Sequence, residues 1–285
     1  MNALLKTCLC QKDRVAFDKL RDDVRQLNVV CNGSNIVQDD IFNVIRNYSR
    51  KAEQHIEILR YPIDDDEFCA CTFIREGIIF VVVNSVLSLS KQIFAAAHEL
   101  YHIYCYLEGE NPEYYSTGSI LKSNVIDENE IAEEDMKANA FAGLFLAPKE
   151  FLQEQIDIYG IRIGRIETKD IIQLMDIFAI PYKAVVLRLY EDGLINERKA
   201  DDLLSKTAEE IDKMIQLTGM AKRWQISTEK VLELGSLEER LADNTELAFI
   251  TDERSDDDVE RLNKIKAYLS EGYISNERRK KESFA

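Results

Sequence analysis

Two of the three histidines in this chain, His98 and His102, stand four residues apart, and Glu99 directly follows the first of them. Apolar residues recur at helical spacing through residues 90–108, so the sequence predicts one helix over this stretch. Four residues make slightly more than one helical turn. Both imidazoles therefore share one face of the helix and can converge on a single metal ion, with Glu99 beside it.

This pattern is typical of zinc-dependent hydrolysis. A catalytic zinc site needs three protein ligands, an open position for water and a general base near that water. Zinc lowers the pKa of its bound water from about 16 to about 7, and a carboxylate then relays the proton to the leaving group. His98 and His102 are the predicted ligands and Glu99 is the predicted catalytic base. The third ligand has to come from another part of the chain.

Candidates for the third ligand lie in a second predicted helix, which extends from about residue 129 to Pro148. Asp135 stands three residues before Ala138 and six before Phe141, so it lies on the apolar stripe that faces the core. Glu134 is seven residues before Phe141 and lies on the same side, whereas Glu133 turns away. Helical geometry therefore leaves Asp135 and Glu134 as alternatives, since acidic residues are also common in the first turn of a helix without any ligand role.

These two segments, NSVLSLSKQIFAAAHELYHIYC and DMKANAFAGLFLAP, resemble the ImmA/IrrE family of zinc metallopeptidases. That family pairs an HExxH helix with a downstream helix of the form E-x-x-A-N-x-F-A-x-x-L-L-x-P, and the resemblance covers roughly residues 40–195. It implies a gluzincin-like, zincin-like core in which His98 and His102 bind Zn²⁺ and Glu99 acts as catalytic acid and base. The family's ligand glutamate falls in register with Asp135, and Glu134 is the alternative.

The resemblance also implies a biological role. Members of this family are cytoplasmic proteins of bacteria or mobile elements that cleave a helix-turn-helix transcriptional repressor and so induce gene expression. On this basis we expect a DNA-binding repressor as the protein substrate. The alternative is a regulatory protein that keeps the fold, and with it the ability to bind a repressor or another protein, but does not cleave.

Several elements are expected to position the two-histidine helix. Residues 67–74 and 78–85 are rich in β-branched and aromatic residues and flank a short glycine-containing turn, which predicts a β-hairpin. Residues 12–28 and 38–58 have mixed charge with apolar positions at helical spacing, which predicts two helices. Residues 109–128 have no clear period, and we expect a loop that forms a flap over the site. Tyrosines 101, 114 and 115 are candidate donors to an oxyanion, although packing is the more common role for Tyr101.

The character of the sequence changes at about residue 166. We therefore predict an α+β fold, with a zincin-like metallopeptidase domain over residues 1–165 and a helical substrate- or partner-binding region over residues 166–285. Residues 168–195 suggest two helices joined by a proline-containing turn. At least three further helical segments are expected in residues 196–219, 227–248 and 256–272. Residues 166–198 carry six acidic and four basic side chains, which disfavours DNA reading by this helix pair.

Composition narrows the class of protein. The net charge of −16 weighs against nucleic acid or an anionic membrane as the main partner, because both attract basic surfaces. The sequence contains no apolar run long enough for a transmembrane helix and no recognisable signal peptide, so a cytoplasmic location is expected. Six cysteines are then expected to remain reduced.

Overall fold

The computed structural model describes residues 2–31, 36–65, 67–75, 77–108, 119–122, 133–229, 231–235, 256, 257 and 260. Helices predominate, and together with one mixed sheet they form an α+β fold. The helices are α1 (Ala3–Thr7), α2 (Leu9–Lys12), α3 (Arg14–Cys31), α4 (Ile41–Lys51), α5 (Leu89–Leu107), α7 (Glu133–Leu146), α8 (Lys149–Ile158), α9 (Thr168–Phe178), α10 (Tyr182–Glu191), α11 (Glu197–Leu204) and α12 (Ala208–Thr218), with short 3₁₀ turns η1 (Gln38–Asp40), η3 (Ile163–Arg165) and η4 (Lys222–Gln225).

The sheet contains four strands in the order β1-β3-β2-β4. These strands are β1 (Ile56–Tyr61), β2 (Phe68–Arg75), β3 (Ile78–Asn84) and β4 (Ser119–Lys122). Strands β2 and β3 form the predicted hairpin, and β4 pairs with β2 in the antiparallel sense. Strand β1 runs parallel to β3 on the other side. The hairpin leads from β3 directly into α5, so the sheet fixes where the two-histidine helix begins.

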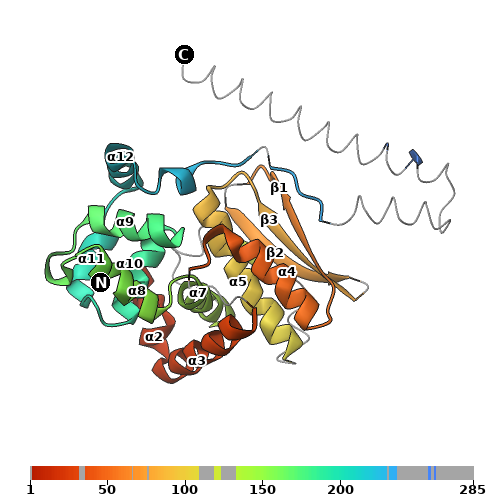
Figure 1. Cartoon of the computed structure of the whole chain (residues 1–285), viewed down its shortest axis with the longest axis horizontal. Coiled ribbons are helices and arrows are strands. Elements are labelled where there is room, and N and C mark those ends of the chain that lie inside the picture. The colour runs from red at the N-terminus through yellow and green to blue at the C-terminus, as the bar shows by residue number, and fades with distance from the viewer. Residues whose placement is uncertain are drawn as a thin grey trace, which may run out of the picture.

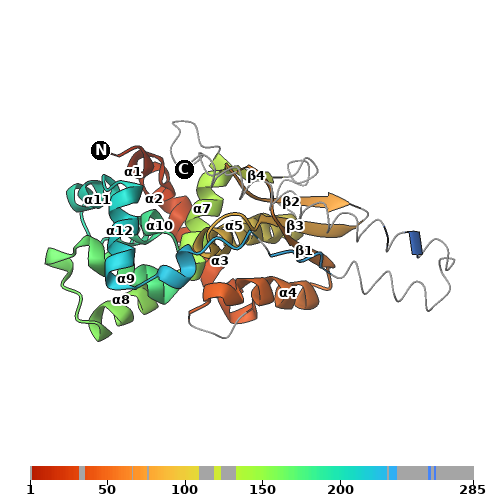
Figure 2. The same cartoon turned by 90° about the horizontal axis from the view of Figure 1, so that it is seen from above.

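Helix α5 packs on β2 and β3, and α4 lies beside it against β1. Helix α7 packs along α5, and α3 covers α7. Figure 1 shows the sheet at one end of the molecule, helices α8 to α11 at the other, and α5 and α7 between them. The same order is visible from above in Figure 2. The two helices that carry the candidate site therefore lie in the middle of the molecule.

The C-terminal half of α7 is joined to α10 through Arg188, whose side chain is fully buried. Arg188 donates to the carbonyl oxygen of Ala147 (3.2 Å) and pairs with Glu191 (2.7 Å) and Asp192 (2.6 Å). The guanidinium reaches this position by crossing α7 at Gly143, where an added Cβ would lie 2.7 Å from Arg188 Cδ. A glycine is required at this crossing because any side chain would overlap the arginine.

Residues 226–229 and 231–235 follow η4 as an extended segment, which we call the C-terminal strap. Ser227 forms an isolated antiparallel bridge with Ser88, just before α5, and Glu233 forms another with Arg60 on β1. In Figure 1 the strap is the blue segment that runs along β1. It contacts the sheet edge and the start of α5, which are far from it in sequence.

The structure confirms the helices predicted near residues 12–28, 90–108 and 129–148, although residues 129–132 lie outside the described part. It also confirms the hairpin, the helix pair α9–α10, and the helical character of residues 196–219. Gly193 follows α10 with a positive φ of 71°. The domain boundary at residues 165/166 stays a prediction.

Three predictions of local structure are wrong. The helix expected over residues 38–58 ends at Lys51, and Ile56–Tyr61 form β1, because pairing with β3 outweighs the local helical pattern. The loop expected over residues 109–128 contains β4, and its remaining residues lie outside the described part. The strap replaces the helix expected from residue 227, since its backbone bonds to Arg60 and Leu89 require an extended chain. The C-terminal region is therefore not all-helical. Most of residues 256–272 also lie outside the described part.

Candidate metal centre

His98 and His102 lie on the face of α5 that is turned toward α7, and both side chains are completely buried. Their Nε2 atoms face one another at 3.2 Å. Two nitrogens bound at about 2.0–2.1 Å to one tetrahedral zinc ion lie about 3.3 Å apart. The spacing of the two imidazole nitrogens therefore matches that of two ligands of one zinc ion.

Asn139 on α7 orients the first of these imidazoles. Its Oδ1 atom lies 3.0 Å from His98 Nδ1. An amide oxygen only accepts hydrogen bonds, so the His98 proton resides on Nδ1, and Nε2 presents its lone pair. Metal-binding histidines commonly donate their other ring N–H in this way. Asn139 thus holds His98 in the tautomer that a metal ion requires.

Burial keeps both imidazoles neutral at pH 7. Removal from water lowers the pKa of His98 to about 4, although the hydrogen bond to Asn139 opposes this change. Burial, followed by the neighbouring His98, lowers the pKa of His102 to about 2. A metal ion binds the neutral imidazole, so neither histidine has to lose a proton before binding.

Asp135, in the first turn of α7, brings a carboxylate oxygen to the two imidazoles. Its Oδ1 atom is 3.9 Å from His98 Nε2, and one ligand atom from each of His98, His102 and Asp135 lies within 4.8 Å of the other two. Burial, followed by the charge of Glu134, raises the pKa of the Asp135 carboxyl. A nearby cation would reverse this unfavourable environment for the carboxylate. Within the described part of the chain, no other group of three such side chains comes this close.

Glu134 is held elsewhere by two partners. Tyr101 on α5 donates to its Oε2 atom (3.0 Å), and Lys137 lies 3.1 Å from its Oε1 atom. Tyr101 is itself buried and packs against the rings of His102 and Phe141. Of the two alternatives left open by the sequence, the structure brings Asp135 and not Glu134 to the histidines. Tyr101 has the packing role expected of it, and Tyr114 and Tyr115 lie outside the described residues.

Glu99 is also completely buried. The pKa of the Cys71 thiol on β2 is raised to about 12 by burial and then by the negative charge of Glu99. Helix α5 packs on β2, so the Glu99 charge acts across this contact.

Sequence reasoning missed Asn139, although a signal was present. Asn139 stands four residues after Asp135, on the same helical face, and is a polar amide within a stripe of alanines and phenylalanines. A polar residue at such a position normally has a specific buried partner.

A search against models of known protein families and against curated proteins finds no match for this chain. None of the described helices is both long and apolar enough to cross a membrane.

Proposed function

We propose that this protein is a zinc-dependent endopeptidase with a zincin-like core, of the kind found in the ImmA/IrrE family. One observation carries the proposal: two buried, neutral imidazoles face each other at 3.2 Å, and the carboxylate of Asp135 lies beside them. A pair of structural histidines would not need a third, anionic group at this position. The arrangement fits the donor set of a catalytic zinc site, in which a water occupies the fourth position.

In this proposal His98, His102 and Asp135 hold the zinc ion. Zinc, when bound, would supply a water molecule of lowered pKa and polarise the scissile carbonyl. Glu99 accepts the proton of that water and donates it to the leaving amine. Asn139 fixes the tautomer of His98, and Tyr101 holds Glu134 away from the ligand position.

Asp135 has a shorter side chain than glutamate. Its Oδ1 atom lies 3.9 Å from His98 Nε2, whereas two ligand atoms of one tetrahedral zinc ion lie about 3.3 Å apart. Zinc binding by all three residues would therefore require a small inward movement of this carboxylate.

We further propose a helix-turn-helix repressor as the substrate and the cytoplasm as the location. The acidic balance of −16 supports a protein partner with a basic surface, which a DNA-binding repressor has. The same balance disfavours direct binding to nucleic acid.

Metal analysis of the purified protein tests the metal site. We expect about one equivalent of zinc in the wild type and a loss of zinc in His98→Ala, because one of three ligands is removed. Glu99→Gln should retain zinc but lose about 10²- to 10⁴-fold in the rate of peptide cleavage, because it removes the general base. The proposal would be contradicted if the wild-type protein contained no zinc and His98→Ala changed neither its metal content nor its activity.

The second candidate function is a regulatory protein that binds a repressor without cleaving it. The short reach of Asp135 favours this alternative, because a weak third ligand lowers zinc affinity and so leaves less of the protein in the zinc-loaded form that catalysis needs. Co-expression with a repressor encoded beside this protein separates the two functions. If Glu99→Gln relieves repression as well as the wild type does, cleavage is not the mechanism.

A further inference from the structure

The C-terminal strap contacts the helix that carries the candidate metal ligands. Leu89, the first residue of α5, donates its backbone N–H to Ile226 (3.2 Å). One turn further along α5, Gln92 is completely buried and donates to Thr228 Oγ1. The strap is thus bonded to the first turn of α5.

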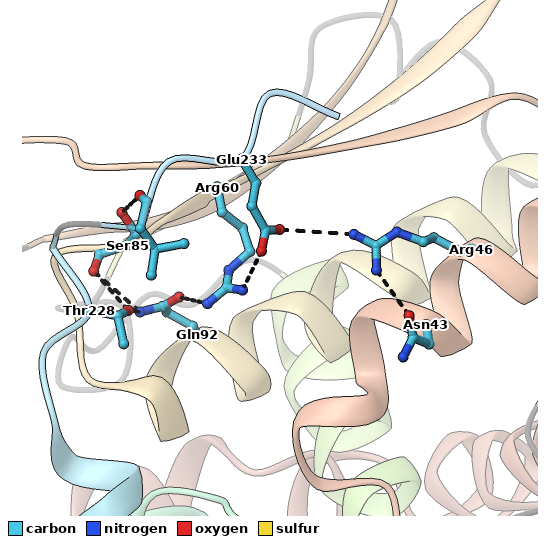
Figure 3. A network of polar contacts seen from close by, with 8 residues as sticks. Asn43, Arg46, Arg60, Ser85, Gln92, Thr228 and Glu233 are labelled. Carbon is cyan, nitrogen blue, oxygen red and sulfur yellow. Dashed lines mark hydrogen bonds and ion pairs between the residues drawn. The ribbon is translucent and has the colours of Figure 1, made fainter. Parts of the chain in front are cut away.

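A polar network extends from Gln92 to the sheet edge, as Figure 3 shows. Gln92 Oε1 accepts from Arg60 on β1 (2.9 Å), and Arg60 pairs with Glu233 of the strap (3.1 Å). The backbones of Arg60 and Glu233 exchange two hydrogen bonds, at 2.9 and 2.7 Å. The guanidinium of Arg60 also lies over the ring of Phe42, 4.4 Å from its centroid. One residue of the strap therefore supplies the counter-ion for a half-buried arginine that itself contacts α5.

The strap is held by polar contacts and not by apolar burial. None of its described residues is buried. By contrast, α5 and β3 contribute many completely buried residues to the core. Segments with few buried apolar contacts open at a lower free energy than the global fold. The strap can accordingly detach while the core stays folded.

We propose that the C-terminal strap is a releasable latch on α5: when it detaches, the first turn of α5 loosens and the candidate metal site binds zinc more weakly. Detachment removes Ile226 from Leu89, Thr228 from Gln92 and Glu233 from Arg60 at the same time. The first turn of α5 then loses its hydrogen bonds to the strap, and Arg60 loses its counter-ion. His98 follows Gln92 by six residues on the same helix. Loosening of the first turn therefore weakens the part of α5 that lies next to the turn with His98. The zinc part of this inference rests on the proposed function, whereas the latch itself does not.

Hydrogen exchange at single amides tests the latch. The amides of Arg60, Glu233 and Leu89 donate across the contact between the strap and the rest of the protein, and the Gln92 amide closes the first turn of α5 onto Ser88 (3.0 Å). We expect Glu233→Gln to speed exchange of the first three amides by at least about tenfold, because it weakens a charged hydrogen bond. Exchange at Gln92 should rise with them. Zinc affinity, measured by competition with a chelator, should fall about fivefold or more, the lower end of typical couplings between sites.

The matched control is Glu229→Gln. It makes the same change of charge in the same strap, at a residue with no hydrogen bond or ion pair to the described residues outside it. It should leave all four amides and the zinc affinity unchanged. If Glu233→Gln lowers the midpoint of global unfolding, Thr228→Val carries the same test, because it removes the hydroxyl that contacts Gln92.

Three results would overturn the latch. Wild-type strap amides that exchange only through global unfolding would show that the strap does not detach separately. Equal behaviour of Glu233→Gln and Glu229→Gln would remove the role of the ion pair. Faster exchange in the strap with no change at Gln92 or in zinc affinity would remove the link to α5. If the wild type binds no zinc while the Gln92 amide still responds, the latch stands and the proposed function fails.

Discussion

Helix α7 contacts two clusters of buried or half-buried polar groups, and the two clusters differ in how their charges are balanced. Near its C-terminal end, the positive charge of Arg188 is compensated by Glu191 and Asp192 at 2.7 and 2.6 Å. At its other end, two neutral imidazoles and a carboxyl of raised pKa bring their ligand atoms within 4.8 Å of one another and have no positive charge among them. The first cluster is complete as it stands. The second is the kind that a cation would complete, and this is what distinguishes a candidate functional site from a structural one.

The largest effect should come from breaking the complete cluster. Arg188→Met leaves Glu191 and Asp192 buried without their cation, and the free energy of unfolding should fall by about 3–5 kcal/mol. The loss should be the same with and without zinc, which denaturant unfolding in the presence and absence of a chelator can measure. A loss that appears only with zinc would mean that the two clusters are not independent.

At the incomplete cluster, removing the carboxylate should affect zinc and not the fold. Asp135→Asn should lower zinc affinity by more than about 100-fold, since losing a ligand costs more than the 10- to 100-fold lost with an outer partner. Stability of the metal-free protein should stay the same or rise, because a carboxyl in an unfavourable environment has been removed. Glu134→Gln is the control and should retain zinc. The opposite ranking of these two variants in a chelator competition would make Glu134 the ligand.

Asn139→Ala tests the orientation of His98. It removes the group that fixes the imidazole proton on Nδ1, so zinc affinity should fall about 10- to 100-fold. Asn139→Asp also accepts this hydrogen bond and should recover most of the affinity. Equal loss in both variants would indicate a packing defect rather than loss of the hydrogen bond.

The smallest effect concerns pH. The folded pKa of His98, about 4, lies below the unfolded value of about 6.5, so between these values the unfolded state binds more protons. Stability of the metal-free protein is therefore full above the unfolded pKa and falls on acidification, by about 2 kcal/mol from His98 between pH 7 and pH 5. Urea unfolding at both pH values measures the change, and His98→Gln should reduce it. A wild-type stability that does not fall would contradict burial of the neutral imidazole.

The sequence predicts the central part of this site well because its information is local. The spacing of His98 and His102 defines a helical face, and the hairpin before them is marked by its composition. The choice between Asp135 and Glu134 is not local. It depends on the hydrogen bonds that Glu134 accepts from Tyr101, on another helix, and from Lys137, three residues further along α7. Strand β1 and the strap were missed for a related reason. Their extended form depends on partners far away in sequence, and no local pattern identifies those partners.

The crossing of Arg188 over Gly143 has a consequence for the evolution of the protein. A methyl group at position 143 overlaps the arginine, and a shorter side chain at position 188 leaves two buried carboxylates uncompensated. Neither position can therefore change first without a penalty. Among descendants of this chain, position 143 should acquire a side chain only in lineages that have also replaced Arg188 and its two acidic partners, so these four sites should covary as one unit.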